Sequence, residues 1–465
     1  MVDVLLVEPP YRSLKGVMAE SAYPMSLVEL AAYLEQAGVS VGVLCCDLLL
    51  GIKPSPVFDF DVESYAQGQR NYAAAVADDT HEVWGKIRRA IEGLNPKLVG
   101  ITCLTPARKA AFNVAACVKK VRPETDVVMG GHHPTFCTAE VLDQDAVDYV
   151  VRGEGETPLL TLARQVIKGR TDPASIPGLS YLDGGELRSN PVAPLMAALD
   201  ELPLPARHLV LDCDFQTFNG HLAGSARGCP YVCSFCSDRR LWGGKVRRRT
   251  PARLIEDLKK VDADYAVGTV DLVDGTFTFD KRYLSDFARL YQAEGLSVKW
   301  RCTARYDNID DEMLGWLRQT NCTGLYFGLE SGSPEILKSV SKKTTLEGIL
   351  AASKLVKDSG IMSITSILLG LPEERATDVQ QTLDLMERIH TDLFDINCYV
   401  PLPGTTYYDE MSEADRQKVN WDTAGYKSFD NDFNKHIPVE QLRSFLNQAY
   451  SIAGETMERL RQSLR

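Results

Sequence analysis

Three cysteines within eight residues constrain this chain more than any other feature of its sequence. Cys229, Cys233 and Cys236 form a CxxxCxxC run, and Phe235 directly precedes the third cysteine. Three thiolates on one loop can hold three irons of a cubane iron–sulfur cluster and leave the fourth iron open, whereas electron-storing clusters normally take four protein ligands. The alternative is structural zinc, which usually needs a second pair of cysteines or histidines to complete its tetrahedron. Because no second pair is present, the run predicts a cluster with an open iron.

At these residues the chain resembles the radical SAM superfamily, whose members bind a [4Fe–4S] cluster with a CxxxCxΦC loop in which Φ is aromatic. The resemblance implies that Cys229, Cys233 and Cys236 are the metal ligands and that Phe235 lies against the adenine of S-adenosylmethionine (SAM). In that superfamily the open iron binds the amino and carboxylate groups of SAM, and reduction releases a 5′-deoxyadenosyl radical. The resemblance also implies an external reductant of the flavodoxin or ferredoxin type.

Length and charge limit the class of protein. The chain has 465 residues, enough for two or three domains, and a net charge of −12, which disfavours a general nucleic-acid binder. No run of 18 apolar residues is present, so we expect no membrane span. The first residues favour a strand over a signal peptide, so we expect a cytoplasmic protein. The cysteines outside the run are scattered, which is typical of small buried side chains.

Strands and helices alternate through residues 1–190. Short apolar runs predict strands at residues 2–7, 39–46, 97–102, 126–129 and 148–151. Apolar residues at helical spacing predict helices at residues 27–34, 81–94, 108–121 and 156–168. Residues 51–80 are expected to form an irregular insertion. The alternation predicts an α/β fold in which a doubly wound parallel sheet, Rossmann-like, binds its ligand at the carboxyl ends of the strands.

Two of these strand ends carry motifs. Residues 102–105 read Thr-Cys-Leu-Thr, and residues 130–134 read Gly-Gly-His-His-Pro. The pair resembles the SxL and GG motifs of cobalamin-binding domains, with threonine in place of serine, and residues 152–156 match a third piece of such domains. In that family the two loops enclose the nucleotide tail of the cofactor, away from cobalt. The resemblance therefore implies these cobalamin-binding residues: Thr102, Leu104, Thr105, Gly130, Gly131, His132, Pro134, Gly153 and Glu154.

The first loop departs from the cobalamin pattern. Many such domains carry DxHxxG there, and its histidine ligates cobalt from below, whereas residues 8–26 contain no histidine. We therefore expect cobalamin without a histidine lower ligand. His132 and His133 are expected to form a hydrogen-bonded pair beside the nucleotide and not to bind a metal. The alternative is a Rossmann-like domain that binds no ligand.

The middle of the chain predicts a hairpin and then a linker. A turn at Asp183-Gly184-Gly185 predicts a hairpin within residues 178–190. Several prolines within residues 191–222 predict a semi-extended linker, because proline fixes φ and interrupts helices. These are Pro191, Pro194, Pro203 and Pro205.

The second half repeats the alternation. Strands are expected at residues 265–272, 298–302, 324–328, 364–370 and 395–400, with helices between them, which predicts a partial (β/α)6 barrel at residues 223–405. Residues 406–465 form a C-terminal region that ends in an amphipathic helix at residues 439–464. In relatives this region caps the barrel mouth and shapes the substrate pocket, and a docking element is the alternative.

Barrel chemistry takes place at the carboxyl ends of the strands, and the superfamily resemblance implies SAM contacts there. Asp274 would hold the methionine amino group, although the chain lacks the GGE found in many members. Arg305 would bind the carboxylate of SAM, with an ion pair at the surface as the alternative. Glu330 and Ser331 would bind at the ribose, and a buried Glu330 requires a diol or a basic partner. Leu371 would line the adenine.

A basic run follows the cluster loop at residues 242–249, which read Trp-Gly-Gly-Lys-Val-Arg-Arg-Arg. Its cations favour a solvated face or pairs with acidic residues, and a phosphate or carboxylate of a substrate is the alternative.

The two resemblances together imply a cobalamin-dependent radical SAM enzyme. The expected reaction transfers a methyl group from methylcobalamin to an unactivated carbon of a small-molecule substrate, with a 5′-deoxyadenosyl radical abstracting the hydrogen. One alternative is an oxidative cyclase or rearrangement enzyme that does not transfer a methyl group. Another is a cobalamin-binding sensor or carrier with a structural cluster. No residue identifies the substrate or a catalytic side chain.

Overall fold

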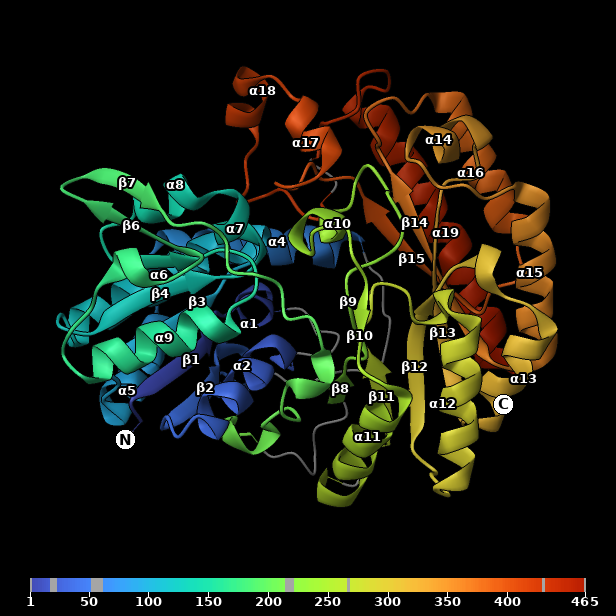
Figure 1. The fold of residues 1–465 in the computed structure, drawn as a ribbon. Coiled ribbons are helices and arrows are strands. Elements are labelled where there is room, and N and C mark those ends of the chain that lie inside the picture. The colour runs from blue at the N-terminus through green and yellow to red at the C-terminus, as the bar shows by residue number, and fades with distance from the viewer. Residues whose placement is uncertain are drawn as a thin grey trace. The chain divides into compact units, whose positions relative to one another are not determined.

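The chain folds into two compact units (Figure 1). The computed structural model describes residues 2–16, 23–51, 62–213, 221–265, 268–428 and 431–463. The first unit comprises Met1–Pro56 and Gln67–Phe218, and the second comprises Val57–Ala66 and Asn219–Arg465. Among the described residues, no helix has both the length and the apolar character that crossing a membrane would require.

The first unit is built on a seven-stranded sheet with the order β2-β1-β3-β4-β5-β6-β7. Its strands are β1 (Val4–Glu8), β2 (Val41–Cys45), β3 (Leu98–Thr102), β4 (Asp126–Gly130), β5 (Tyr149–Val151), β6 (Leu179–Asp183) and β7 (Glu186–Ser189). Strands β1 to β5 are parallel, which confirms the predicted doubly wound sheet. The predicted hairpin, β6 and β7, continues this sheet in antiparallel orientation at its edge. The order reverses between β1 and β3, which makes that point the expected ligand crevice.

Helices cover both faces of this sheet. They are α1 (Arg12–Lys15), α2 (Met25–Gln36), α3 (Cys46–Leu49), α4 (Val62–Ala77), α5 (Glu82–Leu94), α6 (Arg108–Val121), α7 (His132–Phe136), α8 (Thr138–Leu142) and α9 (Glu156–Ile167). Side chains of α4, α5 and α6 pack with Leu5 and Val7 of β1 on one face. On the other face, Gly100 leaves room for Leu6 and for Leu159 of α9.

Helix α4 corrects the prediction of an irregular insertion at residues 51–80. Its buried residues, Tyr72, Ala75 and Val76, lie one turn apart and pack in the core. Alanine, glutamine and asparagine fill most of the remaining positions, so the sequence shows little contrast between the two faces of the helix. Residues 52–61 of the predicted insertion lie outside the described residues.

The proline-containing segment that follows the hairpin lies along the first unit. The amide of Ala206 donates to the carbonyl of Val28 at 3.0 Å, and the amide of Leu211 donates to the carbonyl of Val43 at 2.8 Å. Two short 3-10 turns, Leu199–Glu201 and Arg207–Leu209, interrupt its extended backbone. Up to residue 213 the predicted linker is therefore held by backbone hydrogen bonds to its own unit, and residues 214–220 lie outside the described part.

The second unit contains a six-stranded parallel sheet with the order β15-β14-β13-β12-β11-β8. Its strands are β8 (His221–Ala223), β11 (Thr269–Leu272), β12 (Lys299–Ala304), β13 (Cys322–Glu330), β14 (Met362–Leu369) and β15 (Leu393–Cys398). Helices alternate with these strands: α11 (Pro251–Tyr265), α12 (Lys281–Ala293), α13 (Asp311–Gln319), α14 (Pro334–Ser339), α15 (Leu346–Ser359) and α16 (Ala376–Arg388). This is the predicted partial barrel. The strand expected to begin at residue 265 begins at 269, because Tyr265 ends α11.

The tail helix α19 (Val439–Ser463) belongs to the barrel wall. Leu442, Leu446 and Ala449 are buried in the barrel core, and the hydroxyl of Tyr450 donates to the carbonyl of Ile396 at 3.3 Å. Figure 1 shows α19 running beside β15. Within the C-terminal region that is expected to cap the barrel mouth, this helix covers the edge of the sheet with its apolar face. An amphipathic pattern shows that a helix packs, but not on what it packs.

A substitution at Gly332 tests how closely the turn after β13 approaches α16. A Cβ atom at this position would lie 2.5 Å from the carbonyl oxygen of Gln381 and 2.6 Å from Cα of Thr382, and both of these are backbone atoms. We expect Gly332→Ala to lower the free energy of unfolding by about 2 kcal/mol through overpacking, measured by urea denaturation. The control is Gly315→Ala in α13, where a Cβ meets nothing within 4 Å and helix propensity favours alanine by about 1 kcal/mol. Equal effects of the two substitutions would contradict this prediction.

Candidate functional site

The cluster loop begins at a position that only glycine can occupy. Gly228 has φ +92°, and a Cβ atom there would overlap the carbonyl oxygen of Lys245. The backbone must pass this close because β9 (Ala226–Arg227) pairs with β10 (Arg247–Arg248) on either side of the loop. Left-handed backbone costs glycine little, so the turn directs Cys229 away from the β9–β10 ribbon without strain.

Asp274 fixes the segment before this turn. Its carboxylate accepts hydrogen bonds from the amide of Ser225 at 2.7 Å, from the amide of Ala226 at 2.9 Å and from the hydroxyl of Ser225. Burial raises the pKa of Asp274, and these hydrogen bonds act in the opposite direction. The side chain is 2 % exposed, so the predicted contact with the amino group of SAM is corrected: Asp274 positions the entry to the cluster loop.

The loop itself rests on the carboxyl ends of three strands. Cys229 Sγ lies 3.8 Å from Oγ1 of Thr276, just after β11. The hydroxyl of Tyr231 accepts a hydrogen bond from Nδ2 of Asn308 at 2.6 Å, beyond β12. The amide of Ser234 donates to the carbonyl of Val340 at 3.3 Å, beyond β13. The three cysteines thus lie on the side of the barrel where radical SAM chemistry is expected.

Arg305 packs against this loop. Its guanidinium lies 3.8 Å from the ring centroid of Tyr231, and its Nε and Nη2 atoms donate to the carboxylate of Asp307, each at 2.8 Å. The ion pair that the sequence left as an alternative is therefore present, although Arg305 is buried and not at the surface. Stacking on Tyr231 adds a second support for the loop.

Glu330 has the basic partner that its burial required. Its carboxylate pairs with Nζ of Lys342 at 2.7 Å, and Lys342 also donates to the carbonyl of Gly328. Glu330 has φ +72°, an uncommon backbone conformation that turns its side chain at the strand end. Burial raises the pKa of Cys233, Lys342 lowers it and Glu330 raises it, so the pair lies close to the cluster loop. Sequence reasoning missed Lys342 because nothing in its local sequence marks it.

Ser331 does not face a ligand. Its side chain is fully buried, lies 3.2 Å from Oγ1 of Thr382 and accepts a hydrogen bond from the amide of Ser333 at 3.1 Å. The prediction of direct SAM contact by Ser331 is therefore wrong, because its hydroxyl fixes the turn after β13.

Phe235 and Leu371 lie together as predicted for an adenine side. Phe235 is half-buried and packs against an apolar cluster that includes Leu371. The other members are Ile336, Val340, Leu368 and Tyr399. The cluster loop thus contributes an aromatic ring to apolar surface from the ends of β14 and β15.

The basic run is packed and not solvated. Arg227 and Arg247 lie 5.7 and 5.8 Å from the ring of Trp242. Arg248 lies 3.8 Å from the ring of Tyr283 and donates to the carbonyl of Phe277 at 2.8 Å. Aromatic faces take up Arg247 and Arg248, which corrects the expectation of a solvated face for these two arginines, and the expected pairs with acidic residues stay a prediction.

The first unit presents backbone at the carboxyl ends of β3 and β4, where the two motif loops lie. Gly131 has φ +104°, and a Cβ atom there would come within 3.0 Å of the carbonyl of Cys103, so the two motif loops touch. Leu104 is 55 % exposed, and Thr102, Gly130 and His132 are partly exposed beside it. These loops therefore leave apolar and backbone surface open, where the resemblance predicts the nucleotide tail of cobalamin.

Other predicted cobalamin residues turn inward. Oγ1 of Thr105 lies 3.2 Å from Nδ1 of the buried His133, and Pro134 is buried beside it. The carboxylate of Glu154 accepts from the amide of Met196 at 2.6 Å, and Gly153 N donates to Thr135 at 3.1 Å. Contact of the Thr105, Pro134 and Glu154 side chains with cobalamin is therefore corrected: these residues hold the loops in shape.

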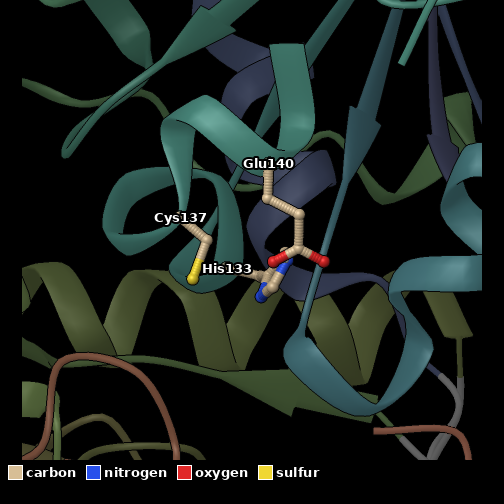
Figure 2. Close-up of side chains that lie close together, drawn as sticks. All are labelled: His133, Cys137 and Glu140. Carbon is tan, nitrogen blue, oxygen red and sulfur yellow. The ribbon is translucent and has the colours of Figure 1, made fainter. Parts of the chain in front are cut away.

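His133 of α7, Glu140 of α8 and Cys137, the residue between these helices, lie together with ligand-type atoms within 4.8 Å of one another (Figure 2). The carboxylate of Glu140 already has a cationic partner, because Nε of Arg108 donates to it at 3.0 Å. Nδ1 of His133 lies 3.2 Å from Oγ1 of Thr105, and this contact joins the two motif loops.

A segment of the C-terminal region, which the sequence predicted to cap the barrel mouth, contacts the strand ends of the barrel. The amide of Cys398 donates to the carbonyl of Tyr426 at 2.6 Å, and Nδ2 of Asn434 donates to the carbonyl of Leu371 at 2.6 Å. Tyr426 is 46 % exposed, and its phenol lies within electrostatic range of Cys236 and Glu330 at the cluster loop. Aromatic and polar composition was the only sequence signal for this segment.

Family models match both halves of the chain. The model of the Radical SAM superfamily matches residues 225–386, and that of the B12 binding domain matches residues 11–163. The first spans the cluster loop and most of the barrel, and the second spans the sheet with the two motif loops.

Similar proteins share this combination. An uncharacterized methyltransferase of Pyrococcus horikoshii is 31% identical over 396 residues, which cover 82% of this chain and 85% of the relative. The anaerobic magnesium-protoporphyrin IX monomethyl ester cyclase of Rubrivivax gelatinosus is 26% identical, covering 96% and 78% of the two chains. The structure of the radical SAM methyltransferase TsrM of Kitasatospora setae, with cobalamin and a [4Fe–4S] cluster bound, superposes with a TM-score of 0.68 at 20% identity, covering 89% and 78%. The chain therefore belongs to the family of radical SAM enzymes with a B12-binding domain, and its cofactors are a [4Fe–4S] cluster, SAM and cobalamin.

Proposed function

We propose that this enzyme transfers a methyl group from cobalamin to an unactivated carbon of a small-molecule substrate. The observation that carries the proposal is the cluster loop with three thiols, placed beside the buried Glu330–Lys342 pair and the apolar side formed by Phe235 and Leu371. This arrangement leaves one iron for SAM and provides a carboxylate and an apolar surface for the rest of that molecule. The methyltransferase name of the relative with 31% identity supports methyl transfer as the outcome.

The chain's own residues hold and orient the cofactors in this proposal. Cys229, Cys233 and Cys236 would bind the cluster, Glu330 would bind the ribose hydroxyls of SAM, and Phe235 would cover its adenine. When bound, the cluster and SAM supply a 5′-deoxyadenosyl radical, and cobalamin supplies the methyl group. The protein's contribution is position and the exclusion of water, since the cofactors carry the difficult chemistry. An external reductant of the flavodoxin or ferredoxin type would deliver the electron.

The first unit would hold cobalamin mainly through backbone. Gly131 allows the close approach of the loops, and Gly130, Thr102, Leu104 and His132 are exposed or partly exposed beside it. Residues 8–26 offer no histidine to cobalt from below, so the cofactor would lack a histidine lower ligand.

A second candidate is oxidative ring closure or rearrangement without methyl transfer. It is favoured by the cyclase relative, which matches 96% of this chain. A sensor or carrier with a structural cluster is disfavoured, because such a protein has no need of the carboxylate at Glu330 or the apolar side beside it.

The first experiment separates the two reactions. The protein is reconstituted anaerobically with iron, sulfide and cobalamin, given reductant and SAM, and its small-molecule products are analysed by mass spectrometry. We expect methylcobalamin and S-adenosylhomocysteine together with 5′-deoxyadenosine. If 5′-deoxyadenosine forms while cobalamin stays bound but unmethylated, methyl transfer is excluded and ring closure or rearrangement becomes the better proposal.

The cluster assignment is tested by Cys233→Ala. Removing one of three thiolates leaves an incomplete ligand set, so we expect loss of 5′-deoxyadenosine formation and of cluster absorbance while cobalamin stays bound. Cys117→Ala is the matched control, because Cys117 is buried in α6, far in sequence from the loop. Continued SAM cleavage by the Cys233→Ala variant would contradict the assignment of Cys233 as a cluster ligand.

The role of Glu330 is tested by Glu330→Gln. The amide keeps the size of the side chain but loses the charge-assisted hydrogen bonds to a ribose diol, so we expect the Kd for SAM to rise about tenfold. Equilibrium dialysis with radiolabelled SAM measures the change. Glu335→Gln on the exposed side of α14 is the control. An unchanged Kd in Glu330→Gln would show that this carboxylate does not contact SAM.

A further inference from the structure

The inner face of the barrel carries several polar side chains, whereas its outer face packs in a mainly apolar core. Side chains alternate across each strand, and Trp300, Cys302 and Ala304 of β12 are buried in the core. Among the alternate positions of β12 to β15, which face the other way, six carry polar side chains that can make hydrogen bonds to a ligand. These are Arg301, Thr303, Tyr326, Ser366, Asp395 and Asn397.

Asp395 is the centre of a hydrogen-bond network on this face. Its carboxylate accepts from the hydroxyl of Tyr326 at 2.5 Å and from Nδ2 of Asn397 at 3.0 Å, and it pairs with Nζ of Lys427. Burial would raise the pKa of Asp395, but Lys427, Tyr326 and Asn397 outweigh burial and hold it below its usual value. The carboxylate is therefore ionised, and it fixes the orientation of three neighbours.

Asn397 is left with an acceptor that points away from this carboxylate. Its Nδ2 atom donates to Asp395 and to Oγ of Ser366 at 3.1 Å, which fixes the plane of the amide. Its Oδ1 atom then faces the opposite direction, and within the described residues it accepts no hydrogen bond. Asn397 is half-buried although its neighbours Ile396 and Cys398 are buried. A fixed carbonyl of this kind accepts an N–H or O–H group and rejects a carboxylate or a hydrocarbon.

Tyr426 and Lys427, which are adjacent in the chain, connect this acceptor to the SAM side of the barrel. Lys427 pairs with Asp395, and the preceding Tyr426, whose side chain is 46 % exposed, lies near Cys236 and Glu330. The segment therefore reaches from the Asp395 network to the cluster loop. A molecule bound at Asn397 would lie on the side of the barrel where the radical is formed.

We propose that Tyr326, Ser366, Asp395, Asn397 and Lys427 form a substrate-anchoring site in which Oδ1 of Asn397 accepts a hydrogen bond from the substrate. The substrate is then a water-soluble molecule that carries a hydroxyl, amino or amide donor, and not a hydrocarbon lipid. This inference rests on the proposed function in that it places a substrate of the radical reaction inside the barrel.

The test uses the reconstituted holoenzyme with SAM and reductant. The probes are the water-soluble and the chloroform-soluble fractions of a bacterial cell extract. The readout is the ratio of 5′-deoxyadenosine formed with and without each fraction. We expect the water-soluble fraction to stimulate the wild-type enzyme severalfold, and Asn397→Leu to reduce this stimulation about tenfold at subsaturating amounts, because it leaves the substrate's donor unpaired.

Three comparisons make the result interpretable. Asn447→Leu on the exposed side of α19 makes the same chemical change elsewhere and should behave as wild type. Ser366→Ala keeps the acceptor but loosens its orientation, so it should lose less stimulation than Asn397→Leu. Iron and sulfide content reports whether each variant has folded around its cluster.

The inference is overturned if only the chloroform-soluble fraction stimulates the enzyme, if neither fraction does, or if Asn397→Leu matches wild type. SAM labelled with deuterium in its methyl group is used in the same reactions to judge the proposed function separately. Stimulation by the water-soluble fraction without transfer of label contradicts methyl transfer and supports the anchoring site. Label transferred only into the chloroform-soluble fraction supports methyl transfer and contradicts the anchoring site.

Discussion

The buried carboxylate of Asp274 is the interaction on which the catalytic side of the second unit depends. It accepts three hydrogen bonds, all from residues 225 and 226, at the point where the chain enters the cluster loop. A buried carboxylate is tolerated only when it is bonded in this way, and each amide left without it would cost about 1–3 kcal/mol. Because Gly228 turns the chain directly afterwards, the direction of the whole loop follows from this anchor. The contacts of Tyr231 and Ser234 with later strand ends are possible only once that direction is fixed.

Ion pairs at the barrel's strand ends hold the remaining polar groups in place. Glu330 pairs with Lys342, Arg305 with Asp307 and Asp395 with Lys427, and each pair is at least partly buried. Buried pairs add little net stability, but removing one partner leaves a charge that costs about 3–5 kcal/mol. Their value here is position, since groups that act on a ligand must be held before it binds. The barrel therefore pairs charged groups near its reacting end and keeps apolar packing for its outer face.

Local sequence patterns predicted the helices and strands. They did not predict which residues distant in the sequence are in contact. The strands of the second unit were found because apolar runs such as residues 364–370 are buried on at least one face and bounded by glycine. Helix α4 was missed because alanine and amide side chains gave its two faces too little contrast. Among site residues, the cysteines and Phe235 are defined by spacing within one loop, which a sequence shows directly. Asp274 was assigned to the wrong partner because its donors lie nearly fifty residues earlier, and a single sequence does not show which carboxylate meets which amide.

The two units differ in the groups that they offer to a ligand: mainly backbone in the first, and side chains in the second. In the first, the contact between Gly131 and Cys103 and the hydrogen bond between His133 and Thr105 shape the loops, and few side chains face outward. Backbone of this kind recognises a large rigid ligand by shape, and it offers nothing that distinguishes one substrate from another. In the second unit, side chains on the inner face of the barrel differ in charge and hydrogen-bonding capacity, so discrimination between substrates is expected there. Methyl transfer and ring closure can then share both cofactors and the whole fold, and the site proposed around Asn397 would contribute to the choice of substrate.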